Sequence, residues 1–217
     1  MTFASDANGA NRPGAKFWDR MAKSYSKNPI SDEASYQHKL HLTQGYFRPD
    51  MNVLEFGCGT GSTALSHAPL VNHIQAIDIS PKMIEIAREK AASEKVTNVG
   101  FEVDTIDEFD ISDESYEVVL GMSILHLLHD PDRAMRKVYT FLKPGGVFIS
   151  STACLGDNMK YFGPVAFIGR VLGLLPLVKI FTTAELESSL TAAGFTIEHA
   201  WCPGKSKSVF VVARKPD

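Results

Sequence analysis

The sequence predicts a doubly wound α/β fold, with a mainly parallel sheet of seven strands and an antiparallel last strand. Short apolar runs alternate with helix-like segments along most of the chain, an order typical of parallel strands joined by crossover helices. The last two strand-like runs, at 195–201 and 208–214, have a connection too short for a crossover helix, which permits an antiparallel hairpin. The length of 217 residues suits one α/β domain with a cap or lid in addition.

Two helix-like segments precede the first strand. In residues 16–27 and 31–47, apolar and aromatic side chains recur at about helical spacing. We therefore expect a disordered tail at 1–14, a helical cap at 15–48 and the main domain at 49–217, with an apolar lid insertion at about 156–181.

The elements of the main domain follow in order. Strands are expected at 52–56, 73–79, 99–103, 116–121 and 147–151, and helices at 62–68, 81–93, 131–142 and 183–193. Ser80 followed by Pro81 is a typical helix start, with the serine as N-cap and the proline at the first helical position. Residues 143–146 contain a proline and two glycines, so they predict a turn before the fifth strand.

Composition narrows the class of protein. A formal net charge of −3 argues against broad nucleic-acid binding, which depends on Lys and Arg neutralising phosphates. Three widely spaced cysteines, Cys58, Cys154 and Cys202, indicate free thiols in a reducing compartment. The first residues lack the pattern of a signal peptide, and the apolar stretch 161–181 is interrupted by charges and prolines. We expect a cytoplasmic protein with no nucleic-acid partner.

The strongest functional signal is a glycine turn with an acidic partner. An apolar strand runs into glycines at alternate positions, Gly57, Gly59 and Gly61, just before a helix. Glycine accepts positive φ and lets a ligand approach the backbone, and a helix start favours an anionic group. Asp78 closes the next strand, where a carboxylate can accept both hydroxyls of a ribose. Together they favour a site for a nucleoside with an anionic tail, against the alternative of a structural turn and a solvated carboxylate.

Motifs in order along residues 16–214 resemble those of class I S-adenosylmethionine-dependent methyltransferases of the small-molecule type, the group that includes ubiquinone and menaquinone biosynthesis enzymes. The run 53–61 resembles the first motif and 78–83 the motif of the second strand. The opening of the fourth strand at 116–119, the region 125–130 after it and the turn 142–146 are also similar. The resemblance implies S-adenosylmethionine as cofactor, a small-molecule acceptor and no metal.

The resemblance also implies which residues hold the methionine half of the cofactor. Glu55 would lie near its amino group, and a backbone carbonyl of Gly121 or Met122 would accept from its ammonium. The backbone of the turn would cradle this half through Gly57, Cys58 and Gly59. Cys58 is interpreted as a small residue tolerated in the turn rather than as a nucleophile.

The ribose and adenine would contact a second group of residues. Asp78 would take the ribose hydroxyls, and Ile79 would lie against the adenine. Asp104, with the backbone of Thr105, would meet the adenine amino group, unless Asp104 is only a solvated charge in an acidic loop. Tyr25 would close over the cofactor, or alternatively pack the cap on the sheet.

Methyl transfer from a sulfonium needs little from the protein beyond alignment of the acceptor and exclusion of water. A hydroxyl or carbon acid as acceptor would also need a general base. His126 and His129 are candidate bases because both follow the fourth strand. Of the two, His126 is the candidate catalytic residue. The alternative is a helical turn with one packed and one exposed histidine.

The apolar insertion bears on the acceptor. Residues 161–178 would roof the acceptor pocket, which favours an apolar or amphipathic acceptor such as a quinone precursor or a lipid. Residues 160–178 could equally rest on a membrane surface, pack in the domain core or form a dimer contact, so a monomer and a homodimer both stay open.

Two other functions compete with methyl transfer. A nicotinamide-dependent oxidoreductase would need its third glycine one residue later than Gly61. A non-catalytic binding module usually lacks the glycines or the ribose acid, which this chain retains. Enzymes that methylate nucleic-acid amino groups carry an Asn or Asp-Pro-Pro-aromatic motif after the fourth strand, where this chain has residues 121–124 instead.

Overall fold

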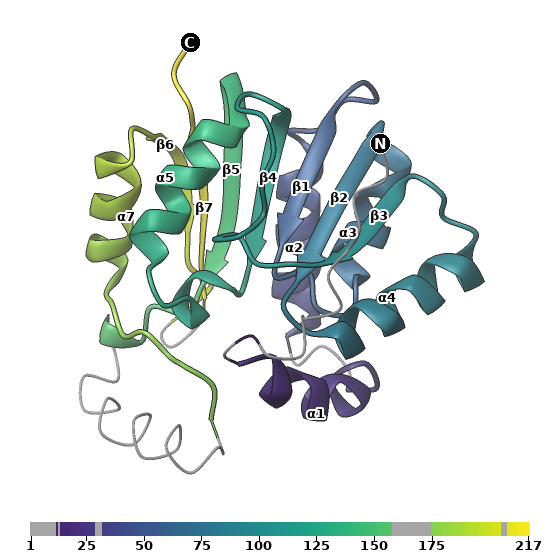
Figure 1. Ribbon diagram of the computed structural model, residues 1–217. Helices are drawn as coiled ribbons and strands as arrows, with labels where there is room; N and C mark the ends of the chain where they lie inside the picture. Colours follow the sequence, from purple (N-terminus) through teal and green to yellow (C-terminus); the bar gives the residue numbers. More distant parts are fainter. Residues whose placement is uncertain (1–11, 13, 29–31, 158–174, 205–207) are drawn as a thin grey trace.

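The computed structural model describes residues 12, 14–28, 32–157, 175–204 and 208–217. A seven-stranded sheet in the order β3-β2-β1-β4-β5-β7-β6 runs through the molecule, with helices on both faces (Figure 1). β7 is antiparallel to β5 and β6, whereas the other paired neighbours are parallel, so the predicted fold class is confirmed. The strands are β1 (Asn52–Phe56), β2 (His73–Asp78), β3 (Val99–Val103), β4 (Tyr116–Met122), β5 (Leu142–Thr152), β6 (Thr196–Trp201) and β7 (Val209–Arg214).

Helices cover the sheet through two hydrophobic clusters, one on each face. Along β1, Val53 belongs to the cluster under α3 and α4, whereas Leu54 and Phe56 belong to the cluster under α5 and α7, as the two-residue period of a strand requires. The helices are α1 (Ala15–Tyr25), α2 (Glu33–Gln44), α3 (Ser62–His67), α4 (Pro81–Glu94), α5 (Pro131–Phe141) and α7 (Thr183–Ala192), with 3-10 turns η2 (Ala68–Leu70), η3 (Leu125–Leu127) and η4 (Leu155–Asp157).

Local capping explains where helices begin. Ser80 is the N-cap of α4, and its hydroxyl accepts from the backbone N of Met83 at 3.1 Å, as the sequence indicates. Thr182 and Glu185 form a reciprocal capping box at the start of α7. Each cap satisfies backbone N–H groups that the helix itself leaves unpaired.

The structure differs from the prediction at the start of the fifth strand. β5 already begins at Leu142, which pairs with Tyr116, and the expected turn at 143–146 lies within it. The register shifts between Tyr116 and Val118, and Gly145 keeps a turn-like φ of +72°. Gly145 also donates to the Lys215 carbonyl at 3.0 Å, so contacts with the end of the chain hold this segment against the sheet.

The cap helix α1 lies beyond the carboxyl ends of the parallel strands and packs against α4 (Figure 1). Of the expected tail, residues 1–11 and 13 fall outside the described residues. Of the expected lid at 156–181, residues 158–174 fall outside them too. No helix in the described part of the chain is long and apolar enough to cross a membrane.

Candidate active site

The glycine turn after β1 adopts a left-handed backbone. Gly57, Gly59 and Gly61 have φ values of +67°, +55° and +76°, a region that other residues rarely enter. A Cβ on Gly57 would lie 2.6 Å from Ile124 Cγ1, so the turn packs tightly against the loop after β4. A Cβ on Gly59 would have only Tyr25 Cε1 within 4 Å among the described residues, at 3.8 Å. The backbone at Gly59 is therefore open to a ligand.

Asp78 connects this turn to the start of α4. Its Oδ2 accepts from Gly59 N and its Oδ1 from Ser80 N, both at 2.9 Å. The Ser80 hydroxyl donates to Asp19 Oδ1 of α1 at 2.6 Å, and the same oxygen accepts from Lys82 N at 3.1 Å. Burial raises the pKa of Asp78, although the two backbone bonds oppose the rise. A continuous hydrogen-bonded chain thus joins the cap, Asp78 and the glycine turn.

Glu55 is a buried carboxyl at the end of β1. Only 1% of the residue is exposed, and Oε2 has no hydrogen-bond partner among the described residues. Burial, followed by the negative charge of Asp78, raises the pKa of Glu55 to about 8. Such a group is costly to ionise unless a cation comes beside it. A protonated amine of a ligand would fit this position.

A cavity of about 680 Å³ opens above the glycine turn, within the size range of sites for small ligands. It lies between the ends of β1, β4 and β5 and the helices α1 and α2. The predicted site residues in its wall are Tyr25, Glu55, Gly57, Cys58, Gly59 and Met122. The predicted residues outside the wall are Asp78, Ile79, Asp104, Thr105 and Gly121. The cavity therefore brings together mainly the residues expected around the methionine half.

Tyr25 stands at the mouth of this cavity. The residue is 54% exposed, and its ring lies over the position that a side chain on Gly59 would take. Partial burial, and then the charges of Asp78 and Glu55, raise the pKa of its phenol. At neutral pH the phenol is thus a neutral group that can cover a ligand and donate one hydrogen bond.

Lys39 is a cavity residue that sequence reasoning missed. It projects from α2, and its Nζ donates to Ser151 Oγ at the end of β5 at 2.7 Å. Ser151 is paired with Met122, so the lysine reaches the same end of the sheet as the predicted ammonium site. One signal was available, because Lys39 lies three residues after Tyr36, which also lines the cavity.

His126, the candidate base, lies in η3 and does not line the described cavity. Its Nδ1 is buried without a partner among the described residues, and burial lowers the pKa of the ring to about 4. The His126 carbonyl accepts from Lys179 N at 2.7 Å, which ties η3 to the segment before α7. His129 is exposed. The catalytic role of His126 stays a prediction.

Two further predicted residues, Gly121 of β4 and Ile79 after β2, do not line the cavity. Gly121 sits between aromatic rings, since a Cβ there would lie 2.8 Å from Phe56 Cζ and 3.2 Å from Phe148 Cε2. Ile79 follows β2 directly and is half-buried. Their predicted contacts with the ammonium and the adenine stay predictions.

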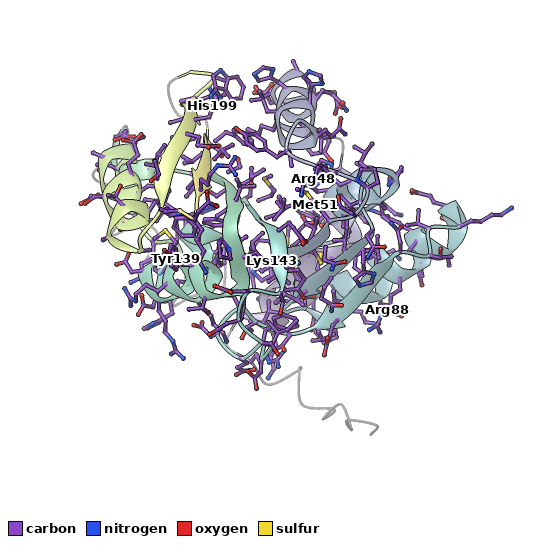
Figure 2. All side chains as sticks on the ribbon, turned by 90° about the horizontal axis from the view of Figure 1, so that it is seen from above. Arg48, Met51, Arg88, Tyr139, Lys143 and His199 are labelled. Carbon is purple, nitrogen blue, oxygen red and sulfur yellow. The ribbon has the colours of Figure 1, made fainter. Side chains whose placement is uncertain are left out.

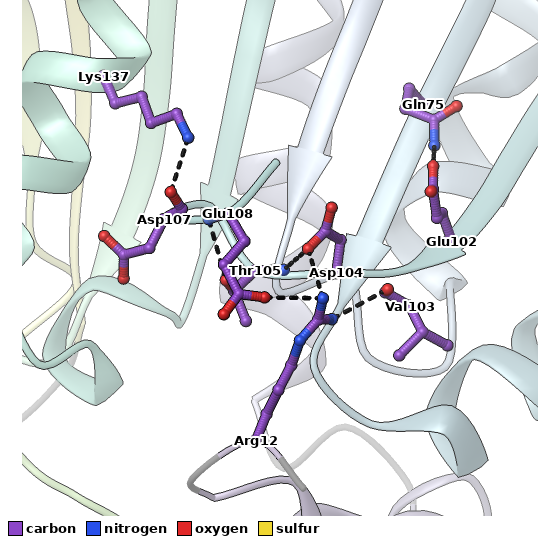
Figure 3. Close-up of polar contacts among 9 residues, drawn as sticks. All are labelled: Arg12, Gln75, Glu102, Val103, Asp104, Thr105, Asp107, Glu108 and Lys137. Carbon is purple, nitrogen blue, oxygen red and sulfur yellow. Dashed lines mark hydrogen bonds and ion pairs between the residues drawn. The ribbon is translucent and has the colours of Figure 1, made fainter. Parts of the chain in front are cut away.

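Asp104 follows β3 and is held by the N-terminal segment. Arg12 NH2 lies 2.9 Å from Asp104 Oδ1, and Thr105 N donates to the same oxygen at 2.7 Å (Figure 3). Only 17% of the Asp104 side chain is exposed, so Asp104 is a partly buried, paired carboxylate. Its contact with the adenine stays a prediction.

A second cavity, of about 520 Å³, lies at the opposite end of the strands, near the starts of β1, β4 and β5. Arg48, Met51 and Lys143 line it, and Figure 2 looks onto this edge of the molecule. Lys143 is paired with Glu117, and Arg48 lies 3.4 Å from Asp50. This second cavity is lined by none of the residues predicted for the cofactor site.

A family profile described as a methyltransferase domain matches residues 47–203. Among curated relatives, an arsenite methyltransferase of Halobacterium salinarum is 32% identical over 154 residues, which cover 68% of this chain and only 38% of that protein. A ubiquinone biosynthesis O-methyltransferase of Azorhizobium caulinodans is 29% identical over 84% of this chain and 76% of its own length. A solved SAM-dependent methyltransferase of Methanosarcina mazei aligns with a TM-score of 0.67 and 19% identity, over 81% of this chain and 97% of that chain.

Proposed function

The chain belongs to the S-adenosylmethionine-dependent methyltransferase family, and on that premise we propose that it methylates a small apolar or amphipathic acceptor by in-line displacement. The observation that carries the proposal is the buried, unpartnered carboxyl oxygen of Glu55 beside an open glycine turn. The family match argues against the nicotinamide-dependent oxidoreductase. An intact Glu55 and Asp78 argue against a module that has lost its site.

We assign the methionine half of the cofactor to the walls of the larger cavity. Glu55 would pair with the ammonium, and the carbonyl of Gly121 or Met122 would accept from it. Lys39, the cation at that end of the cavity, would pair with the carboxylate. The turn backbone would face this half through Gly57, Cys58 and Gly59.

The nucleoside half would extend past the end of β2. Asp78 already holds two backbone N–H groups, and its remaining lone pairs suit the ribose hydroxyls. Ile79 would face the adenine, while Asp104 and Thr105 would meet its amino edge. Tyr25 would cover the cofactor from α1, where its ring excludes water from the reacting centre.

The bound cofactor supplies an electrophilic methyl group, and the protein aligns the acceptor with it. Acceptors that are nucleophilic as bound need no base. His126 lies outside the described cavity wall, and its lowered pKa makes it a weak base. If it nevertheless lines the acceptor pocket, His126→Ala should lower turnover on the true acceptor. Unchanged turnover would remove this role.

The two relatives suggest different acceptors. Arsenite is a thiophilic acceptor, and soft ligand chemistry needs accessible thiolates. Here Cys58 and Cys154 are buried, which raises the pKa of Cys58 well above its usual value and that of Cys154 to about 11. Cys202 is exposed, so one of the three cysteines is accessible as a thiol. No cluster of three or more His, Cys, Asp or Glu residues in the described ranges could hold a metal. These features favour an organic acceptor, in line with the apolar residues 161–178.

Membrane contact through 160–178, a monomer or homodimer, and a cytoplasmic location remain predictions from the sequence, since residues 158–174 lie outside the described part.

The proposal is tested first by calorimetric titration with S-adenosylmethionine and S-adenosylhomocysteine. We expect micromolar binding of both, lost in Asp78→Ala. Methylation of quinone precursors and of lipids is then compared by mass spectrometry, with an amine and arsenite as contrasting acceptors. Failure of the folded protein to bind either ligand would contradict the cofactor site. Methylation of arsenite alone would contradict the apolar acceptor.

A further inference from the structure

Arg12 links three groups at the carboxyl end of β3. Its NH1 donates to the Val103 carbonyl at 3.0 Å, and its NH2 lies 2.9 Å from Asp104 Oδ1 and 2.8 Å from Glu108 Oε2 (Figure 3). A planar guanidinium can serve several acceptors in one fixed arrangement, which an ammonium does not reproduce. Arg12 and Asp104 are separated by 92 positions in the sequence, so this contact is made by the fold.

This cluster is more than an exposed ion pair. Only 22% of the Arg12 side chain and 17% of the Asp104 side chain are exposed. Charge-assisted bonds in such partial burial are stronger and more directional than those of solvated pairs. Glu108 is the exposed member, at 60%.

The cap helix α1 has other attachments besides the Arg12 contact. Asp19 already joins α1 to the start of α4 through Ser80 and Lys82. Ala15 and Ala22, which belong to α1, are also buried. The Arg12 contact therefore acts on the loop after β3 rather than on the position of α1.

Its effect on Asp104 is to fix one carboxylate oxygen. Oδ1 accepts from Arg12 and from Thr105 N, whereas Oδ2 accepts from no residue in the described part of the chain. The turn that follows is held as well, because Glu108 N donates to Thr105 Oγ1 at 3.2 Å. A carboxylate with one oxygen anchored in this way offers the other as an acceptor of fixed orientation.

We propose that Arg12 is a positioning residue for the base of the cofactor, which fixes Asp104 so that the site selects a 6-amino purine over a 6-oxo purine. The proposal rests on the proposed function, which places the adenine beside Asp104. An exocyclic amino group donates to the free oxygen, whereas a 6-oxo group would set one acceptor against another. Sites built to hydrogen-bond one group reject analogues that lack it, provided that the partner cannot turn away.

The test compares S-adenosylhomocysteine with its 6-deaminated analogue, in which hypoxanthine replaces adenine. Both dissociation constants are measured by calorimetry for the whole chain and its variants. We expect the wild type to prefer the adenine ligand by about tenfold or more, as for a charge-assisted hydrogen bond. Arg12→Gln should reduce this preference to about twofold, and Arg12→Lys should restore part of it.

Two further variants separate positioning from general damage. Arg133 of α5 lies 3.7 Å from Asp107, which is in the same loop as Asp104. Arg133→Ala removes this cation and should leave the preference for the adenine ligand unchanged. Asp104→Asn should abolish or invert the preference, because an amide can donate to a 6-oxo group. Thermal melts confirm that each variant is folded.

The outcomes are distinct. If Arg12→Gln weakens both ligands equally and keeps the wild-type ratio, Arg12 is only structural and the proposal is overturned. If the wild type binds both ligands equally well, Asp104 does not read the base, and the proposal falls while the cofactor site stands. If the wild type binds neither ligand, the proposed function itself has failed.

Discussion

Replacing Glu55 by glutamine removes a buried ionisable group and keeps its shape. The pKa of Glu55 in the folded protein is raised from 4.5 to about 8, so the folded state holds the proton more tightly than the unfolded chain does. The contribution of Glu55 to the free energy of unfolding is therefore greatest below about pH 4.5 and falls as the pH rises toward 8. Each pH unit inside this window costs about 1.4 kcal/mol, which makes about 3 kcal/mol at pH 7. Glu55→Gln should be more stable than the wild type by up to about that amount.

Urea unfolding at pH 5, 6, 7 and 8 measures this difference. The comparison between two proteins cancels the contributions that they share, among them those of His67 and His126, whose pKa values are both lowered to about 4. The stability difference should grow by about 1.4 kcal/mol per pH unit between about pH 5.5 and pH 7 and level off toward pH 8. A difference that stays constant from pH 5 to pH 8 would refute the reasoning.

The same carboxyl links binding to protons. In the free protein Glu55 is mostly protonated at pH 7, and a neighbouring ammonium would favour its charged form. Binding of S-adenosylhomocysteine at pH 7 should thus release about one proton, seen as a difference in heat between phosphate and Tris buffers. Glu55→Gln should bind about tenfold more weakly and release none. Equal affinity and no proton release in the wild type would contradict the assignment.

Four further predictions concern the glycine turn, the cavity and α3. Gly57→Ala places a Cβ 2.6 Å from Ile124 at positive φ, so it should lower the free energy of unfolding in urea by about 2 kcal/mol or more. Gly59→Ala meets more open space and should mainly weaken the binding of S-adenosylhomocysteine. Lys39→Gln should weaken that binding about tenfold in calorimetry, and unchanged affinity would exclude a carboxylate contact. Burial lowers the pKa of His67 from 6.5 to about 4, so its contribution to stability should fall by up to about 3 kcal/mol from pH 6.5 to 4. The difference in stability between the wild type and His67→Leu, measured by urea unfolding, should change by that amount over this range, because the opposite contribution of Glu55 cancels; a constant difference would contradict the assignment.

Much of the fold could be predicted because local and global preferences agree. In β1 the alternation of Val53 and Leu54 between two cores follows from the strand period alone. The start of α4 follows from Ser80 and Pro81, whose capping needs no distant partner. At the start of β5 the local preference of the residues and their pairing with distant segments disagree. The glycines at 145 and 146 favour a turn, but pairing with Tyr116 and with the end of the chain includes them in the strand.

In the site, too, residues with a local signal could be predicted and residues placed by long-range contacts could not. Glu55, Asp78 and the glycines follow one another along the chain, so their spacing is enough to propose them as site residues. Lys39 meets Ser151 across 112 positions, and Arg12 meets Asp104 across 92. Helical spacing places Lys39 on the face of Tyr36, but no local signal indicates the partner in either contact, because each depends on how a cap segment packs against the far end of the sheet.

The hydrogen-bonded chain from Asp19 through Ser80 and Asp78 to Gly59 also has a dynamic consequence. A ligand that holds Asp78 would restrain every member, so the amide hydrogens at Gly59, Ser80 and Lys82 should exchange with solvent deuterium as one cooperative unit. Ligand addition would then slow their exchange by a common factor, although Lys82 lies on the surface. Occupancy of the site could be followed from outside it, at the first turn of a neighbouring helix.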